Sequence, residues 1–428
     1  MNDTIFALSS GAPPAAIAVL RISGPRAFAV AESLAGRLPE PRRAALRALH
    51  DPASGCLLDR ALIMTFPKGG SATGEPLVEL HVHGGRAVIA AVENALAVQC
   101  DLRMAEPGEF TRRALLAGKI DLSEAEGLGD LLTAETETQR RAAIESAEGA
   151  VSRAAASWRA ELLALSALVE AELDFSDEDD VAASALEDIR TRAGSLAAAI
   201  GGALSNPPVE RLRDGIRVTL AGPPNSGKST LLNALIEREA AIVSPIPGTT
   251  RDRIEAPVSR NGVAYLFTDT AGVRAASDDP IERIGIARSE AAIQEADILL
   301  WLGDDQPPRA DALWIHARAD LPGRNERTAG AELELSAVTG QGMEALWAAL
   351  SDRARDMLPR LDRLVLNRRQ RECAMDCRDA LERGAQVDDA LLVAEEFRQA
   401  RNAIDRLVGR ADVDAMLDQL FARFCIGK

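Results

Sequence analysis

A glycine-rich loop that ends in lysine and serine is the strongest chemical signal in the sequence. Residues 222–229 read Gly-Pro-Pro-Asn-Ser-Gly-Lys-Ser, after a predicted strand at 216–220 and before a predicted helix. In this setting the loop turns backbone N–H groups towards phosphate, and the helix adds its positive end. We expect Lys228 to reach the β- and γ-phosphates and the Ser229 hydroxyl to bind Mg²⁺. The sequence therefore predicts a nucleoside triphosphatase.

Two switch-like segments follow this loop. Thr250 ends the sequence Gly-Thr-Thr, about where a first switch carries a magnesium-binding threonine. Asp269 begins Asp-Thr-Ala-Gly after a predicted apolar strand at 263–267, a pattern typical of a second switch that senses the γ-phosphate. Together with the loop, these segments indicate a GTPase.

The guanine-reading segment departs from the usual Asn-Lys-x-Asp. Residues 317–320 read Ala-Arg-Ala-Asp, after a predicted strand at 313–316. The Asp320 carboxylate can accept hydrogen bonds from guanine N1–H and its amino group, a pattern that adenine cannot offer. Ser336 and Ala337 follow another predicted strand, in a loop suited to hydrogen-bond the guanine oxygen. We expect Asp320 to select guanine, with affinity and strictness left open because the asparagine contact and the lysine packing over the base are missing.

The residue that orients the attacking water is not evident. Val273 follows the second switch, where many small G proteins have a glutamine, and valine cannot orient water. Hydrolysis then needs another side chain, a cation or a partner in trans. Arg274 and Glu282 are candidates, although both also fit the solvated face of a following helix.

The surrounding periodicity predicts a multidomain α/β and α protein. Residues 1–118 are mixed, with strands expected at 16–22 and 77–83. Helical periodicity covers 123 to about 173 and 181–205, and it returns after 361. Between them, strands and helices alternate as in a parallel sheet with flanking helices.

Composition excludes several protein classes. With 49 basic and 65 acidic residues, the net charge of −16 argues against a dedicated nucleic-acid coat, so any RNA contact must be local or shared. Five cysteines are too few and too scattered for a disulfide framework. The sequence shows neither a signal peptide nor an apolar run of membrane-spanning length, which favours the cytoplasm and no membrane.

Other candidate sites favour structural roles. His81 and His83 share one strand face but have no evident third metal ligand. Cys373 and Cys377 are four residues apart, which favours a buried helix face over zinc. The acidic run at 177–180 is expected to be a solvated loop and helix start. Cys425 is open between a nucleophile near the tail and a packing residue, and packing is favoured.

Taken together, the motifs resemble the MnmE/TrmE family of tRNA-modification GTPases nearly end to end. The resemblance rests on these segments: Leu-Arg-Ile-Ser-Gly at 20–24, Thr-Gly-Glu at 73–75, His-Gly-Gly at 83–85, Pro-Gly-Glu-Phe at 107–110, Ile-Pro-Gly-Thr-Thr-Arg-Asp at 246–252, Ile-Glu-Arg-Ile-Gly-Ile at 281–286 and the terminal Phe-Cys-Ile-Gly-Lys at 424–428. The terminal Cys-x-Gly-Lys is especially specific.

This resemblance implies four segments. They are an N-terminal α+β folate-binding and dimerisation domain at 1–118, the first half of a helical domain at 119–213, an inserted P-loop G domain at 214–357, and the second helical half at 358–428. It also implies that GTP hydrolysis drives formation of the 5-carboxymethylaminomethyl group on the wobble uridine, position 34, of certain tRNAs. The implied cofactors are Mg²⁺, K⁺ and a tetrahydrofolate derivative, and the implied partner is the FAD-dependent protein MnmG (GidA), with the chain acting as a homodimer.

Individual residues match the family's functional positions. Ser229 and Thr250 match magnesium ligands, and Asn225, Ser244, Ile246 and Thr249 match potassium ligands. Arg21, Glu79, Lys119 and Lys428 match folate-binding residues. Glu282 matches the carboxylate that positions the attacking water, beside the candidates Arg274 and Lys228. The predicted nucleotide site comprises Asn225, Ser226, Gly227, Lys228, Ser229, Thr230, Ser244, Pro245, Ile246, Pro247, Gly248, Thr249, Thr250, Asp269, Thr270, Ala271, Gly272, Asp320, Ser336 and Ala337.

The sequence also departs from the family pattern. Residues 9–14 replace a Gly/Arg-rich segment, Pro76 stands where an acidic residue is usual, and the segment between Asp320 and Ser336 is short. Two alternatives are an Era/Der-type ribosome-assembly GTPase, against which the acidic balance and the first 210 residues argue, and a folate-binding scaffold with a degenerate G domain. Nucleotide hydrolysis distinguishes the second alternative from a GTPase.

Overall fold

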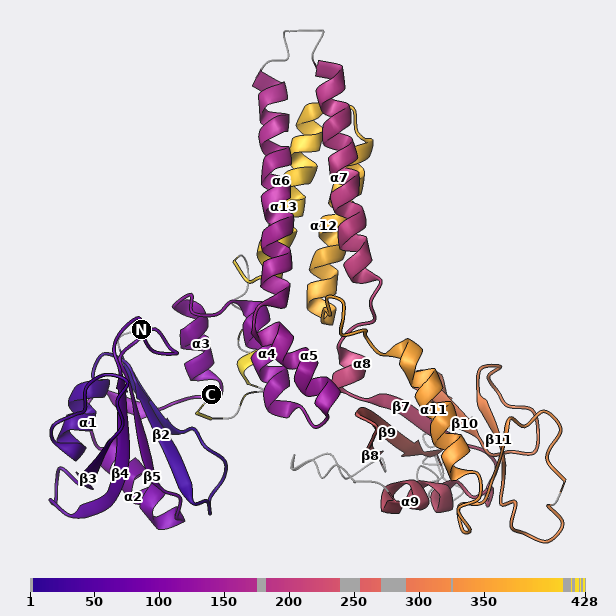
Figure 1. The fold of residues 1–428 in the computed structure, drawn as a ribbon, viewed down its shortest axis with the longest axis horizontal. Coiled ribbons are helices and arrows are strands. Elements are labelled where there is room, and N and C mark those ends of the chain that lie inside the picture. The colour runs from indigo at the N-terminus through magenta and orange to yellow at the C-terminus, as the bar shows by residue number, and fades with distance from the viewer. Residues whose placement is uncertain are drawn as a thin grey trace, which may run out of the picture. The chain divides into compact units, whose positions relative to one another are not determined.

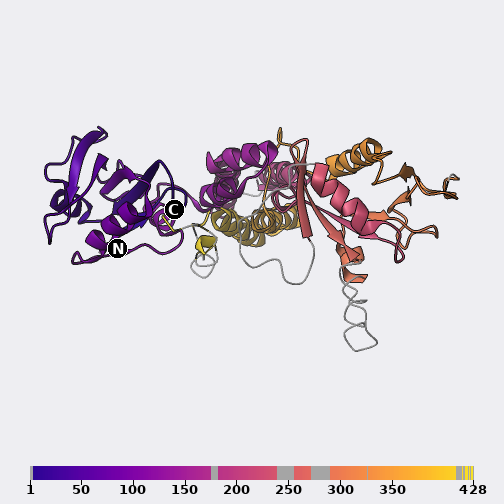
Figure 2. The same cartoon turned by 90° about the horizontal axis from the view of Figure 1, so that it is seen from below.

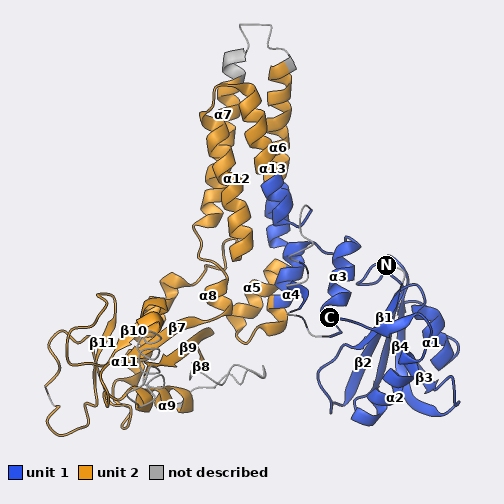
Figure 3. Ribbon diagram, turned by 180° about the vertical axis from the view of Figure 1, so that it is seen from behind, with its two compact units in different colours: residues 1–129, 147–157, 402–428 blue, residues 130–146, 158–401 orange. Residues whose placement is uncertain are grey.

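The computed structural model describes residues 3–174, 182–238, 255–270, 290–324, 326–410, 417, 420–422, 424, 426 and 427. The chain divides into two compact units, which Figure 3 colours separately. Unit 1 comprises Met1–Gly129, Ala147–Ser157 and Asn402–Lys428, and unit 2 comprises Asp130–Ser146 and Trp158–Arg401. No helix of the described part is both long and apolar enough to cross a membrane.

Unit 1 is built on a six-stranded sheet with the order β3-β4-β5-β2-β1-β6. All neighbouring strands are antiparallel except the parallel pair β1 and β6. The strands are β1 (Thr4–Leu8), β2 (Ile17–Ser23), β3 (Ala45–His50), β4 (Leu57–Phe66), β5 (Leu77–His83) and β6 (Leu102–Met104). The predicted strand at 77–83 is therefore confirmed, and the one predicted at 16–22 is confirmed within one residue at each end.

Alternation of apolar residues explains this sheet. In β5, the side chains of Val78, Leu80 and Val82 are buried, whereas the residues between them are more exposed. The helices α1 (Ala27–Ala35) and α2 (Arg86–Ala97) pack against the strands (Figure 1) and complete one apolar core. The short helix α3 (Glu109–Leu116) follows β6.

A buried ion-pair network holds α3 against the sheet. The Arg113 guanidinium, which is 2% exposed, donates to Glu109 at 2.9 Å and to Glu75 at 3.0 Å. Arg103 also pairs with Glu109, at 2.6 Å. Burial by itself would raise the pKa of the Glu109 carboxyl, but hydrogen bonds from Arg103, from backbone and from Arg113 outweigh it and lower that pKa. The charged form of Glu109 therefore stabilises the fold.

Replacing Arg113 with methionine is expected to destabilise unit 1 by about 3 kcal/mol, because two largely buried carboxylates lose a partner. Calorimetry of the full chain at pH 7 should show a transition lowered by about 5–10 °C. The lowered pKa of Glu109 means that its contribution is present above the ordinary value of 4.5 and is lost as pH falls through the lowered value. The difference between the two proteins should therefore shrink below about pH 4.

Arg140→Met is the matched control, since Arg140 pairs with Glu137 on an exposed helix surface. This control should leave the transition unchanged. An Arg113→Met protein as stable as the wild type, or a difference that persists at pH 3, would contradict the assigned role of the network.

Unit 2 contains much of a helical bundle. The helices are α4 (Leu122–Thr133), α5 (Glu137–Ala147), α6 (Ala150–Asp174), α7 (Ala182–Leu204), α12 (Arg368–Gln386) and α13 (Ala390–Leu407), and the division between the units falls within α4, α5, α6 and α13. Within unit 2, α6, α7, α12 and α13 run side by side (Figures 1 and 2). The predicted helical stretch from 123 to 173 is thus three helices, while α7 confirms the stretch predicted at 181–205.

Local sequence features fix this bundle. Asn367 and Gln370 form a capping box at the start of α12. Cys373 and Cys377 both face the buried side of α12, which confirms their structural interpretation. Burial, with the charge of Asp376, raises the pKa of the Cys377 thiol to about 12, so it is not a reactive thiolate at neutral pH.

The second sheet, also in unit 2, has the order β12-β11-β10-β7-β9-β8. Its strands are β7 (Ile216–Ala221), β8 (Glu255–Arg260), β9 (Val263–Asp269), β10 (Ile298–Trp301), β11 (Leu313–Ala317) and β12 (Leu333–Leu335). Five strands are parallel, as predicted, and the edge strand β8 is antiparallel to β9. The helices α8 (Glu210–Arg213), α9 (Lys228–Arg238) and α11 (Met343–Met357) accompany this sheet.

Candidate functional site

The loop between β7 and α9 has a backbone conformation that is strained for most residues other than glycine. Gly227 has φ of +100°, and Asn225, with φ of +61°, also lies in the left-handed region. A side-chain carbon on Gly222 would lie 3.2 Å from the backbone nitrogen of Gly303. The loop therefore needs glycine at positions 222 and 227 to keep its path between β7 and the segment that follows β10.

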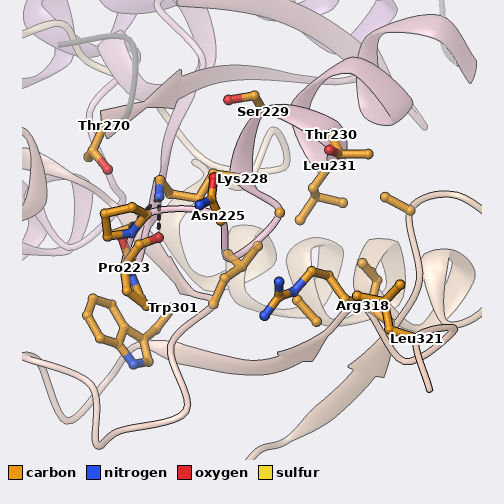
Figure 4. Close-up of a pocket in the computed structure, with 18 of the residues that line it drawn as sticks. Pro223, Asn225, Lys228, Ser229, Thr230, Leu231, Thr270, Trp301, Arg318 and Leu321 are labelled. Carbon is orange, nitrogen blue, oxygen red and sulfur yellow. Dashed lines mark hydrogen bonds between the residues drawn. The ribbon is translucent and has the colours of Figure 1, made fainter. Parts of the chain in front are cut away.

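Lys228, the first residue of α9, is buried and crosses this loop. Its Nζ donates hydrogen bonds to the carbonyl oxygens of Gly222 at 3.0 Å and Pro223 at 2.8 Å, as Figure 4 shows. The amine is thus held at the mouth of the loop whose N–H groups would contact phosphate.

Two side-chain oxygens that could bind a metal ion, from Ser229 and Asp269, lie close together at the end of this loop. β9 lies next to β7 in parallel register, with Asp269 opposite Leu220. This register lets the Ser229 hydroxyl donate to Asp269 Oδ2 at 2.6 Å. The hydroxyl of Thr270, the next residue, donates to the Leu220 carbonyl at 3.0 Å and ties the second switch to β7. A serine hydroxyl and a carboxylate at the end of a phosphate-binding loop fit Mg²⁺, which prefers oxygen ligands.

A cavity of about 870 Å³ extends from this loop, a volume in the range of small-molecule sites. Residues from the loop and α9 line one part of it, while Arg318, Asp320, Leu321, Ala337 and Val338 line another. Figure 4 shows Arg318 and Leu321 on the far side of the cavity from Thr270. The cavity therefore joins the phosphate-binding loop to the segments predicted to read the base.

The residues predicted to read the base come together where β11 and β12 end. Ala317 and Leu335 are opposite each other in parallel register, and the amide of Ala319 donates to the Leu335 carbonyl at 3.1 Å. The buried Ser336 hydroxyl donates to Asp320 Oδ1 at 2.6 Å. This hydrogen bond orients the Asp320 carboxylate, and the other carboxylate oxygen is available for a ligand.

A second set of side chains, which the sequence did not reveal, supports this loop. Arg324 Nε donates to the Ala317 carbonyl at 3.0 Å, and its two terminal nitrogens pair with Asp304 at 2.7 and 2.9 Å. His316 Nε2 lies 3.0 Å from the Arg324 carbonyl. Hydrogen bonds from Arg324 hold the pKa of Asp304 below its ordinary value, against a smaller effect of burial. These hydrogen bonds connect the predicted base-reading loop to β11 and to the segment after β10, although the usual asparagine of the motif is absent.

Comparison with known proteins matches the whole chain to one family. Residues 4–119 match the family model described as GTP-binding protein TrmE N-terminus, and residues 122–425 match MnmE helical domain. The tRNA modification GTPase MnmE of Novosphingobium aromaticivorans is 54% identical and that of Erythrobacter litoralis is 54% identical, each match covering 100% of both chains. The MnmE protein of Zymomonas mobilis is 50% identical over 99% of this chain and 100% of its own.

The chain belongs to the MnmE family of tRNA modification GTPases. This confirms the resemblance inferred from the motifs, and with it a multidomain architecture that includes a P-loop G domain. The relatives match over their full lengths and carry one name, so the Era/Der-type alternative is not supported.

Several predicted MnmE site residues lie outside the described residues. They are Ser244, Pro245, Ile246, Pro247, Gly248, Thr249, Thr250, Ala271, Gly272, Arg274, Glu282, Cys425 and Lys428, together with the acidic run at 177–180. Of the remaining nucleotide-site residues, the structure brings Asn225, Gly227, Lys228, Ser229, Thr230, Thr270, Asp320 and Ala337 to the cavity wall. Asp269 and Ser336 contact two of these through the hydrogen bonds described above.

Three of the residues predicted to bind folate lie in unit 1 among the described residues. Arg21 and Glu79 face each other across β2 and β5, with Arg21 Nε 3.0 Å from Glu79 Oε1. Lys119 donates to the Gly69 carbonyl at 2.6 Å and packs near Gly74. The next residue, Glu75, accepts a bond from the Ser23 hydroxyl at 3.2 Å, two residues along β2 from Arg21.

The chain terminus reaches the same sheet. Ile426 forms a bridge with Pro107, and a side-chain carbon on Gly427 would overlap the Leu8 carbonyl at the end of β1. Gly427 therefore must be glycine for the tail to lie there, with φ of +93°.

His81 and His83 have carboxylate partners of their own. His81 lies 3.2 Å from Glu79 and His83 lies 2.8 Å from Asp59. In the described parts of the chain, no group of three or more His, Cys, Asp or Glu side chains is arranged to hold a metal ion. Both observations agree with the structural interpretation of these histidines.

Proposed function

We propose that this MnmE-family chain hydrolyses GTP to drive formation of the 5-carboxymethylaminomethyl group on the wobble uridine of certain tRNAs. The observation that carries the proposal is one cavity that joins Lys228 and Ser229 to Asp320. Lys228 would hold the β- and γ-phosphates, Ser229 and Thr250 would bind Mg²⁺ next to Asp269, and Asp320 would accept bonds from guanine. A bound Mg²⁺ neutralises charge on the phosphate oxygens. Glu282 would position the attacking water, with Arg274 as a second candidate.

The proposed assembly has further parts. The chain works in the cytoplasm as a homodimer with MnmG, through a folate-binding domain at 1–118, helical segments at 119–213 and 358–428, and a G domain at 214–357. Arg21, Glu79, Lys119 and Lys428 bind a tetrahydrofolate derivative, which supplies the one-carbon unit. The Arg21–Glu79 pair and the tail at Ile426 and Gly427, both on the first sheet, support this placement.

Nucleoside analysis of tRNA tests the function. Cells without this gene should lack 5-carboxymethylaminomethyluridine derivatives at position 34, and the wild-type chain should restore them. The Lys228→Ala chain should not. Modified tRNA in cells without the gene, accompanied by a defect in ribosomal RNA maturation, would contradict the proposal and favour the ribosome-assembly alternative.

We also propose that K⁺ stimulates hydrolysis at a site formed by Asn225, Ser244, Ile246 and Thr249, where it neutralises transition-state charge. GTP turnover by the wild-type chain should be at least about tenfold faster in potassium chloride than in sodium chloride. Asn225→Gly should remove this difference, because glycine keeps the left-handed backbone at residue 225 but removes the amide ligand.

Asn233→Ala is the matched control, since Asn233 is exposed on α9. It should retain the potassium effect. Equal turnover of the wild type in both salts, or a potassium effect that survives Asn225→Gly, would contradict the cation site.

A further inference from the structure

The loop that carries Asp320 is closed by a single arginine side chain. Ala317 ends β11 at the start of this loop, and Arg324 Nε at the other end donates to the Ala317 carbonyl at 3.0 Å. Within the loop, the Arg324 amide donates to the Leu321 carbonyl at 3.1 Å. The side-chain hydrogen bond therefore ties together the two ends of a short irregular segment, and Asp320 lies between those ends.

The guanidinium of Arg324 is itself held from outside the loop. Its two terminal nitrogens donate to the two carboxylate oxygens of Asp304 at 2.7 and 2.9 Å, a bidentate pair with restricted geometry. Asp304 follows β10, the parallel neighbour of β11, so both segments leave the same edge of the sheet. The Arg324 side chain is only 17% exposed. The ion pair therefore keeps the guanidinium against the Ala317 carbonyl.

His316, a buried residue of β11, holds the backbone of Arg324. The Thr328 amide can only donate, and it lies 3.2 Å from His316 Nδ1, so the proton of the neutral ring is on Nε2. That nitrogen donates to the Arg324 carbonyl at 3.0 Å. The Thr328 hydroxyl also donates to Asp304, at 3.2 Å. Arg324 is therefore attached to the sheet through both its side chain and its backbone.

The contacts of Arg324 act on the loop and not on the cavity. Asp320 and Leu321 line the cavity, whereas Arg324 and Asp304 do not. Two simultaneous hydrogen bonds to the edge of a base need a fixed carboxylate, because each bond weakens steeply as its angle departs from linear. The Ser336 hydroxyl orients the Asp320 side chain, but it does not fix the backbone beneath that side chain.

We propose that Arg324 is a positioning residue for guanine selection: held by Asp304, it fixes the backbone that carries Asp320 against the edge of the base. This inference rests on the proposed guanine nucleotide site. Arg324 adds no contact with the nucleotide, so its removal should weaken the hydrogen bonds that Asp320 makes and spare the contacts with phosphate.

Competition binding separates positioning from general stabilisation of the fold. The full chain is titrated with GDP labelled on its ribose, and the label is displaced by GDP, IDP, ADP or inorganic tripolyphosphate. Arg324→Met should weaken GDP by about tenfold and IDP by only about threefold, since IDP lacks the 2-amino group and one of the two hydrogen bonds. Tripolyphosphate, which has no base, should compete as it does with the wild type. Partial unfolding would instead lower every apparent affinity by the same factor.

The role of Asp304 is tested through its dependence on Arg324. Asp304→Asn keeps the size of the side chain but removes its charge, and it should weaken GDP by about threefold. The double variant Arg324→Met/Asp304→Asn should bind GDP within about twofold of Arg324→Met alone, because Asp304 acts through Arg324. Losses that multiply in the double variant would overturn this coupling.

Arg353→Met is the matched control. Arg353 also pairs with a carboxylate, Glu332 at 3.1 Å, donates to a backbone carbonyl, that of Asp311 at 2.8 Å, and does not line the cavity. It should leave the ratio of GDP to IDP affinity unchanged. The same unchanged ratio in Arg324→Met, or an equal loss for tripolyphosphate, would overturn the inference. If ADP competes as well as GDP with the wild type, the proposed guanine site itself fails.

Discussion

Replacing Lys228 with alanine is expected to reduce GTP turnover by about 100-fold or more, since catalysis of phosphoryl transfer depends mainly on positioning and charge stabilisation. The structure places this amine at the mouth of the loop, 2.8 Å from the Pro223 carbonyl. Its charge would stabilise the phosphate oxygens as the bond to the γ-phosphate breaks. Steady-state release of phosphate from GTP by the full chain measures the effect.

Arg217→Ala is the matched control for this change. Arg217 is an exposed cation on β7, the strand that leads into the loop, and it does not line the cavity. The control should hydrolyse GTP at the wild-type rate. A Lys228→Ala protein that retains more than about a tenth of the wild-type rate would show that the loop is not the site of hydrolysis.

Replacing Asp320 with asparagine is expected to weaken GDP binding by about 100-fold, since two charge-assisted hydrogen bonds to guanine are lost. The amide NH₂ of asparagine can instead donate to the carbonyl at position 2 of xanthine. The variant should therefore bind XDP more tightly than the wild type does. IDP, which lacks the 2-amino group, should lose less affinity than GDP. Competition against ribose-labelled GDP, or ribose-labelled XDP for the variant, gives all three values.

Asp311→Asn is the control for charge. Asp311 is exposed in the same domain and pairs with Arg309 at 2.6 Å. It should leave the order GDP, IDP and XDP unchanged. If Asp320→Asn still prefers GDP over XDP, Asp320 is not the residue that reads the base edge. Ser336, which holds Asp320 from the end of β12, would then be the next residue to test.

The phosphate end of the site could be predicted from sequence because its parts are local. A strand, a glycine-rich loop and a helix are consecutive between Ile216 and Arg238, and the spacing alone places Lys228 and Ser229. The contact of Ser229 with Asp269 is forty residues distant in sequence, but both residues belong to motifs whose roles are linked by the same phosphate.

The base end could be predicted only in part. Asp320 and Ser336 were expected to contribute to one site, and the structure adds their hydrogen bond. The contacts of Arg324 with Asp304 and Ala317 depend on how an irregular loop folds, and no periodicity marks them. A side-chain carbon built on Gly227 would lie 3.4 Å from Arg318 Cγ. The sequence could not predict this approach, because it requires two loops from different parts of the chain to meet.

At the edge of the second sheet the prediction missed a strand pairing, although the local sequence contained a signal for it. The antiparallel pairing of β8 with β9 was not expected from the alternation of strands and helices. Yet Asn261-Gly262 joins the two strands, and both residues have positive φ, of 52° and 79°. This dipeptide is typical of a tight hairpin turn, and it could have predicted the antiparallel edge.

The central claim is that one cavity binds guanine nucleotide and hydrolyses GTP although the usual asparagine and lysine of the base-reading motif are absent. Hydrolysis of GTP and of ATP by the purified full chain, measured in parallel in potassium chloride, tests it most directly. We expect turnover of GTP and at least about 100-fold lower kcat/KM for ATP, since adenine lacks the N1–H and amino pattern that Asp320 accepts. Equal kcat/KM for the two nucleotides, or no hydrolysis of GTP, would contradict the claim.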